Sequence, residues 1–199
     1  PFFNILFVYN SFIIYNLVML KKYEKFLKEL DKKLKKYFDE QSEYICCKEG
    51  CSGCCEVGDY PFTQLEMMYL MEGFKALPND IKILVKNSLM QTKSNRVSTH
   101  LFYKCPFLIN NKCSVYKYRG ITCRTFGLAY FTKDKIVKVP ECVHQNLCYS
   151  KVFKDNELLT EPVKECLGLF DIVDSKLAKK YKLEFVSLKS GLLSNRTFV

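Results

Sequence analysis

The sequence predicts a mainly α-helical fold with irregular cysteine-rich metal-binding loops and one short β-hairpin, in a single compact domain. Apolar residues recur at helical spacing on both sides of a central region. That region holds most of the 11 cysteines, mixed with glycines and aromatic residues. A chain of 199 residues can bury a core without disulfides, and an odd number of cysteines cannot all pair internally.

Three helices are expected in the first half of the chain. Apolar side chains in residues 20–38 form a helical stripe, with lysines on the opposite face. Residues 63–66, Thr-Gln-Leu-Glu, have the sequence of a capping box and start a helix that runs through three methionines towards Gly73. We expect these methionines in the core, because thioethers fill irregular gaps. A third helix begins at residues 78–80, Pro-Asn-Asp, and residues 91–99 form a polar loop.

The second half is expected to begin with turns and end with helices. Asn110-Asn111 suits a tight turn, and residues 128–140 suit a short hairpin around Lys133-Asp134-Lys135. Residues from Leu158 onward are predicted to be mostly helical. Because no repeat or long linker divides the chain, we predict one domain at 19–199, with its cysteine core at 45–150.

The N-terminal segment is open to three interpretations. Residues 1–20 carry no charge, and the sequence begins with Pro1. Residues 1–18 are a non-native upstream segment ahead of a start at Met19, or a hydrophobic anchor with its lysine-rich flank inside, or a buried helix or strand. The segment has no basic n-region, so it is a poor signal peptide. Any membrane contact is expected only through residues 1–20.

The charge of the chain argues against nucleic-acid binding. The net charge is +10 and the pI about 9, yet only four of the 31 basic residues are Arg. Arg is the residue that binds phosphates and guanines in bidentate fashion, so a lysine-rich surface without it is typical of a solvated face. Thiolates that bind a metal also offset part of this charge.

The segment 46–55, CCKEGCSGCC, indicates a metal site. Cys51 and Cys54 form a C-x-x-C turn, which lets two thiolates converge on one ion at about 2.3 Å each. Gly50 and Gly53 permit the tight backbone that such loops need. Neighbouring thiolates repel each other unless a cation is present, whereas a disulfide needs no such glycines. We therefore prefer a metal site to disulfides or a redox dithiol.

Four motifs together resemble the YkgJ-type cysteine-cluster family, whose pattern begins C-x-x-C-x-x-C-C. That family is described as a zinc- or iron-chelating domain and also occurs within flagellin lysine N-methylases. The resemblance covers about residues 45–150 and implies a set of eight metal-ligating cysteines. The ligands it implies are Cys47, Cys51, Cys54, Cys55, Cys105 in Cys105-Pro106-Phe107-Leu108, Cys113 in Cys113-Ser114-Val115-Tyr116, Cys123 in Cys123-Arg124-Thr125-Phe126, and Cys142.

The chain departs from the family pattern at two positions. The first gap is C-x-x-x-C, so Cys46 competes with Cys47 for the ligand role. Gly120 stands where the family usually has Pro, which loosens a turn without removing a ligand. Cys46 and Cys166 match no motif and are expected as small core residues, while the role of Cys148 stays open.

One tetrahedral metal site needs only four thiolates, and eight are implied here. The eight thiols therefore bind two ions, or four of them bind one cluster while the others are structural or redox-active. The association with methylases narrowly favours a [4Fe–4S] cluster over zinc. Arg119 and Arg124 lie beside proposed ligands and are expected to offset thiolate charge or to bind an anionic substrate. His100 and His144 are weaker candidates for replacing a thiolate.

Two function classes follow. The first is a cytoplasmic metal-binding protein that coordinates an iron–sulfur cluster or zinc. The second is an iron–sulfur methyltransferase that acts on lysine side chains, as the resemblance implies. The chain has no G-x-G-x-x-G, phosphate-loop or H-E-x-x-H motif, so enzyme status, substrate and protein partner stay open.

Overall fold

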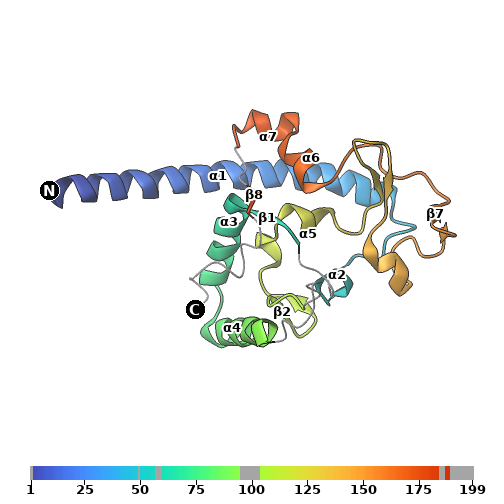
Figure 1. The fold of residues 1–199 in the computed structure, drawn as a ribbon, viewed down its shortest axis with the longest axis horizontal. Helices are drawn as coiled ribbons and strands as arrows, with labels where there is room; N and C mark the ends of the chain where they lie inside the picture. Colours follow the sequence, from blue (N-terminus) through green and yellow to red (C-terminus); the bar gives the residue numbers. More distant parts are fainter. Residues whose placement is uncertain (1, 49, 57–59, 95–103, 184–186, 189–199) are drawn as a thin grey trace.

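A long helix supports the rest of the protein (Figure 1). In this computed structural model α1 is one continuous helix, Phe2–Glu40. Helices α3 and α5 contact it on one side, and α7 contacts it on the other. The structure describes residues 2–48, 50–56, 60–94, 104–183 and 187–188.

The helix predicted at residues 20–38 is confirmed, but it begins well before Leu20. Its buried stripe is the predicted one and consists of Tyr23, Phe26, Leu27, Leu30 and Leu34. The preceding turn, with Ile14 and Leu17, is exposed and extends beyond the other described elements (Figure 1). No helix in the described ranges is both long enough and apolar enough to cross a membrane.

Helices α3 (Gln64–Lys75) and α4 (Asn79–Ser94) follow the short helix α2 (Gly53–Glu56). The capping box is confirmed, because the Thr63 side chain accepts the Glu66 amide and Glu66 accepts the Thr63 amide. The methionines Met67 and Met71 are buried in the core, as expected. Residues 91–94 are helical rather than loop, since no Gly or Pro stops α4 there; residues 95–99 lie outside the described part.

Short strands are more numerous than the sequence indicated. The turn at Asn110-Asn111 is confirmed: both residues have positive φ, 50° and 59°, and join β2 to β3. The hairpin within 128–140 is confirmed as the pair β4–β5. The strands are β1 (Phe62–Thr63), β2 (Leu108–Ile109), β3 (Lys112–Cys113), β4 (Tyr130–Phe131), β5 (Val137–Lys138), β6 (Phe153–Lys154), β7 (Glu157–Leu158) and β8 (Ser187–Leu188), which pairs antiparallel with β1.

The predicted helical region after Leu158 is only partly helical in its described residues, 159–183 and 187–188, and the rest of it lies outside the described part. Between Phe153 and Leu158 the chain forms the hairpin β6–β7, whose Asp155-Asn156 turn has φ values of 51° and 65°. The helices α6 (Leu169–Val173) and α7 (Lys176–Lys180) have only five residues each. Asp and Asn both tolerate positive φ, so Asp155-Asn156 predicts a tight turn. The spacing of apolar residues does not reveal this turn.

Three apolar clusters hold these elements together. The first joins the buried stripe of α1 to α3, α5, α6 and α7. The second joins α3 and α4 to the β2–β3 hairpin, and the third surrounds Ala129 and Tyr149. Between the clusters run the cysteine-bearing loops and three short elements: η1 (Tyr116–Tyr118), α5 (Ile121–Thr125) and η2 (Glu141–Gln145).

Candidate metal centre

The loop that carries the first cysteines is held against the β2–β3 hairpin by the backbone. The Cys105 amide donates to the Cys55 carbonyl at 2.7 Å, and the Tyr60 hydroxyl donates to the Cys54 carbonyl at 2.9 Å. The short helix α2 packs on η2. The two segments predicted to fold onto one another, 47–55 and 105–123, are therefore adjacent.

Four half-buried thiols from these segments form the first thiol group: Cys55, Cys105, Cys113 and Cys123. All four line one cavity of about 450 Å³, and each interacts electrostatically with the other three. Cys51 and Cys54 line the same cavity. Cys55 belongs to α2, Cys113 to β3 and Cys123 to α5, so three different elements fix the positions of the sulfurs.

Arg119 is one of two cationic residues that line this cavity, the other being Lys112. Its guanidinium lies 3.5 Å from the Tyr116 ring centre, and its Nε donates to the Tyr116 carbonyl at 3.0 Å. The side chain lines the cavity beside the first thiol group. Burial raises the pKa values of Cys113 and Cys123, and the charge of Arg119 opposes that rise. A role for Arg119 in offsetting thiolate charge stays a prediction.

Arg124 has a different set of partners. Its guanidinium is only 8% exposed and forms an ion pair with Asp31 of α1. It also donates to the Arg119 carbonyl at 2.9 Å and to the Lys117 carbonyl at 2.8 Å. Its donors are thus engaged in holding α5 against α1, although the residue also lines a cavity of about 320 Å³ with Cys47, Cys51, Cys54 and Cys123.

A second thiol group consists of Cys46, Cys47, Cys142 and Cys148, and η2, which carries Cys142, contacts α2. The Cys148 sulfur is 3.4 Å from that of Cys46 and 3.6 Å from that of Cys47, and Cys142 interacts with it electrostatically. The expectation that Cys46 is a small core residue is wrong, because Cys46 is exposed. Cys148, whose role was open, is almost fully buried at the centre of the group.

Gly127 makes room for this arrangement. Its φ is +98°, and a Cβ there would lie 2.3 Å from the Cys47 sulfur. Only glycine combines this backbone conformation with so close a sulfur. Gly127 therefore allows Cys47, which precedes it by 80 residues in the sequence, to pack directly against its backbone.

The eight predicted ligands consequently divide between two places. Four form the first thiol group, Cys47 and Cys142 belong to the second, and Cys51 and Cys54 lie between the two. Sequence reasoning left Cys46 and Cys148 out of the ligand set. The signal that pointed to them was their closeness in sequence to predicted ligands, since Cys46 adjoins Cys47 and Cys148 follows Cys142 by six residues.

The remaining candidates are apart from both groups. His144 is exposed, with its ring edge-on to Phe153 at 5.8 Å. Cys166 is half-buried and interacts with charges of α6 and the β4–β5 turn. His100 lies outside the described residues.

The electrostatics of both groups favour one anion each. Hydrogen bonds from Cys142 and Cys47 lower the pKa of Cys148 well below its usual range, and the same contacts raise the pKa values of Cys142 and Cys47. Similarly, a hydrogen bond from Cys54 lowers the pKa of Cys55, while burial raises that of Cys105 to about 12. A second thiolate in either group would be repelled by the first, and a bound cation removes that repulsion.

The donor chemistry fits zinc or iron. Free thiols in groups of four are the ligands that both metals take in proteins, and all 11 cysteines are free. As the side chains stand, the described ranges contain no group of three or more His, Cys, Asp or Glu residues placed to hold a metal ion. Closing either group requires rotation of thiols about χ1, which moves a sulfur while leaving the backbone in place.

The loops of this protein gather free thiols around its apolar clusters, an arrangement whose donor chemistry suits a metal. Residues 46–143 match the family model CxxCxxCC, described as a "Putative zinc- or iron-chelating domain". The resemblance drawn from the four motifs is thereby confirmed over this range. The match begins at Cys46 and ends one residue after Cys142, so Cys148 lies beyond it. No curated protein and no solved structure matches the chain.

Proposed function

We propose that this protein is a cytoplasmic metal-binding protein that coordinates an iron–sulfur cluster, or zinc, through the first thiol group. The observation that carries the proposal is the placement of four mutually interacting thiols around one cavity, with Arg119 beside them. Free thiols are typical of a reducing compartment, which supports the cytoplasmic assignment.

The spacing of the sulfurs favours a cluster over a single ion in this group. Four thiolates around one Zn²⁺ lie about 3.8 Å from each other, given Zn–S bonds of about 2.3 Å. In the described part of the chain, no two sulfurs of the first thiol group are in hydrogen-bond contact, and they surround a cavity of about 450 Å³. Each thiolate of a [4Fe–4S] cluster binds a different iron, so such a cluster suits more widely spaced ligands.

The test is metal and sulfide analysis of protein purified without oxygen, together with its absorption spectrum. An iron–sulfur cluster gives brown protein with iron and acid-labile sulfide, whereas zinc gives neither colour nor sulfide. Cys105→Ser and Cys123→Ser should each lose this metal, while Cys166→Ser, which changes a half-buried thiol outside both groups, should keep it. Wild-type protein without stoichiometric metal would overturn the proposal.

Metal loss should also be visible in the fold. The segments at 45–60 and 100–125 supply the first thiol group, and a structural zinc site in small peptides is worth roughly 10–16 kcal/mol. We therefore expect Cys123→Ser to increase protease cleavage within these two segments, measured by limited proteolysis with mass spectrometry. Unchanged protease resistance in a metal-free variant would show that the loops hold their structure unaided.

A lysine methyltransferase activity is the second candidate, carried by the family association alone. It needs a site for S-adenosylmethionine, and isothermal titration of the intact chain with that compound tests for one. Binding would support the enzyme, and an absence of binding would leave metal coordination as the proposed function.

A further inference from the structure

We propose that Cys46, Cys47, Cys142 and Cys148 form a second metal centre, which takes a single Zn²⁺ ion in tetrahedral coordination. The centre extends the proposed function, and Cys148 lies outside the family match. Zn²⁺ binding here displaces thiol protons to solvent and transfers no electrons.

Sulfur spacing is the first argument. Cys46 and Cys47 place their sulfurs 3.4 Å and 3.6 Å from that of Cys148. These separations are far longer than a disulfide bond of about 2.05 Å. They approach the separation of about 3.8 Å expected for thiolates that share one zinc ion. No such contact joins two members of the first thiol group, although the Cys55 sulfur lies 3.9 Å from that of neighbouring Cys54.

The backbone around the group is the second argument. The Cys46 amide donates to the Cys148 sulfur at 3.3 Å, and the Tyr149 amide donates to the Tyr44 carbonyl at 2.7 Å. Asn146 and Tyr149 both have positive φ, 57° and 60°. Two non-glycine residues held in this conformation on either side of Cys148 indicate a loop that is shaped to present its sulfur.

Packing is the third argument. Cys142 and Cys148 are 4% and 1% exposed and belong to an apolar cluster with Ala129, Val143 and Tyr149. An apolar shell around a thiolate group keeps water away and strengthens its attraction for a cation. Cys46 and Cys47 belong to the segment between α1 and α2 and complete the group on the side facing that segment.

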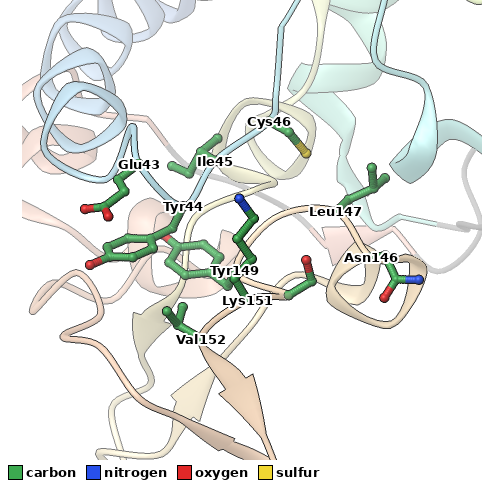
Figure 2. A pocket seen from close by; sticks show the side chains of 10 residues that line it. Glu43, Tyr44, Ile45, Cys46, Asn146, Leu147, Tyr149, Lys151 and Val152 are labelled. Carbon is green, nitrogen blue, oxygen red and sulfur yellow. The ribbon is translucent and has the colours of Figure 1, made fainter.

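An ion can reach the group from solvent. A cavity of about 310 Å³ is lined by Cys46 and by Leu147 and Tyr149, which flank Cys148 (Figure 2). The rings of Tyr44 and Tyr149 stack along it at 5.8 Å, and Glu43 and Lys151 line it as well (Figure 2). Cys46 is the member of the second thiol group that an entering ion meets first.

The experiment measures zinc and iron per chain in intact protein purified without oxygen. Cys148→Ser and Cys46→Ala should each lose one zinc per chain and keep the metal of the first thiol group. Cys105→Ser should show the opposite pattern, and Cys166→Ser should lose neither. Cys46 is exposed, so Cys46→Ala remains informative if Cys148→Ser fails to fold.

Replacement of the zinc by Co²⁺ gives an independent readout. Thiolate-to-cobalt absorption should be present in wild-type protein and in Cys105→Ser, and should fall in Cys46→Ala and Cys148→Ser. Full zinc retention in both of these variants would overturn the second centre. A Cys46–Cys148 disulfide, found in protein purified without oxygen by alkylating free thiols before any reductant is added, would overturn it as well. If Cys105→Ser is the only variant that loses metal, the first thiol group binds metal and the second does not. If neither the wild-type protein nor any variant holds metal, the proposed function and the second centre are both wrong.

Discussion

Two arginines five residues apart have separate tasks. Arg119 lies on the Tyr116 ring at the edge of the cavity, with its charge directed at the first thiol group. Arg124 is buried, and its donors are engaged by Asp31 and by two backbone carbonyls. We therefore expect Arg119 to affect the affinity for metal. We expect Arg124, which joins α5 to α1, to affect the free energy of unfolding.

Arg119→Ala should weaken metal retention while changing the free energy of unfolding little. Loss of a group that supports a metal site typically lowers affinity about 10- to 100-fold. Competition with a chelator measures this, and Lys117→Ala, in the short helix η1 that ends just before Arg119, serves as the control. Retention equal to wild type would mean that Arg119 does not act on the thiols.

Asp31→Ala should lower the free energy of unfolding by about 1.5–3 kcal/mol, the usual worth of a hydrogen bond to a charged group. The Arg124 side chain is only 7% exposed, so it has little access to water as a replacement partner. Urea denaturation measures the change. Asp39→Ala removes an exposed partner of Lys35 on the same helix and should be nearly silent. Equal effects of the two variants would contradict a clamping role for Arg124.

At the scale of elements, one carboxylate joins two helix starts. Glu66 accepts the Thr63 amide at 2.7 Å within its own capping box and the Ile121 amide at 2.7 Å at the start of α5. Gly120 makes this approach possible, because a Cβ there would lie 2.5 Å from the Phe62 ring and 2.9 Å from Glu66. A residue larger than glycine at position 120 would therefore collide with β1 and with Glu66 of α3. This explains why Gly120 stands where the motif resemblance leads one to expect Pro.

Glu66→Gln should destabilise the fold by about 1–3 kcal/mol, because an amide side chain has one acceptor oxygen for two buried backbone donors. Burial raises the pKa of Glu66, yet three hydrogen-bond contacts favour its charged form. Thermal or urea unfolding measures the loss. Gln64→Ala, exposed in the same turn, provides the reference, and a Glu66→Gln variant as stable as that reference would contradict this role.

Gly127→Ala should displace Cys47 and lower zinc retention by the second thiol group. Its φ of +98° disfavours Ala, and the new Cβ would lie 2.3 Å from the Cys47 sulfur. Gly50→Ala is the matched control, because φ is +89° there but no atom lies within 4 Å of a Cβ. Both variants carry backbone strain, of about 1–2 kcal/mol. Equal zinc content in the two would show that the contact with Cys47 is unimportant.

Sequence patterns predicted the elements whose signal is local. Apolar spacing located the stripe from Tyr23 to Leu34, and four residues sufficed for the capping box. The part of α1 before Leu20 was not predicted as helix. Its residues are uncharged and mostly apolar, so apolar and polar side chains do not alternate there at helical spacing. The grouping of Cys148 with Cys46 was also out of reach, since 102 residues separate them and only the packing around Tyr149 brings them together.

At the scale of the whole molecule, the core begins at a definite point along α1. Met19 and Leu20 pack against the first apolar cluster, and Tyr23 and Phe26 are fully buried in it. Ile14, at 61% exposed, precedes these contacts. The part of α1 before Met19 therefore contributes little to the described core.

Deletion of residues 1–18 should leave a folded protein that keeps its metal. Deletion of residues 1–27 removes Tyr23 and Phe26 as well and should abolish folding, since each buried aromatic side chain is worth about 3–5 kcal/mol. Circular dichroism, solubility and metal content measure both deletions. A shorter deletion that is insoluble or metal-free would show that the exposed part of α1 is required.

The ion pair between Asp31 and Arg124 gives the long helix a mechanical property. At a rise of about 1.5 Å per residue, α1 is about 58 Å long, and about 44 Å of it lies between Asp31 and Phe2. Tyr23, Phe26 and Leu30 hold α1 in the core on the N-terminal side of Asp31, so only the part before Met19, about 26 Å long, precedes the core contacts. A tilt of the whole helix by about 5° would nevertheless move its far end by about 4 Å. The ion pair attaches α1 to α5, the helix that also carries Cys123. A rotation of α1 that accompanied metal binding would therefore be large enough to measure with a spin label on its first turns.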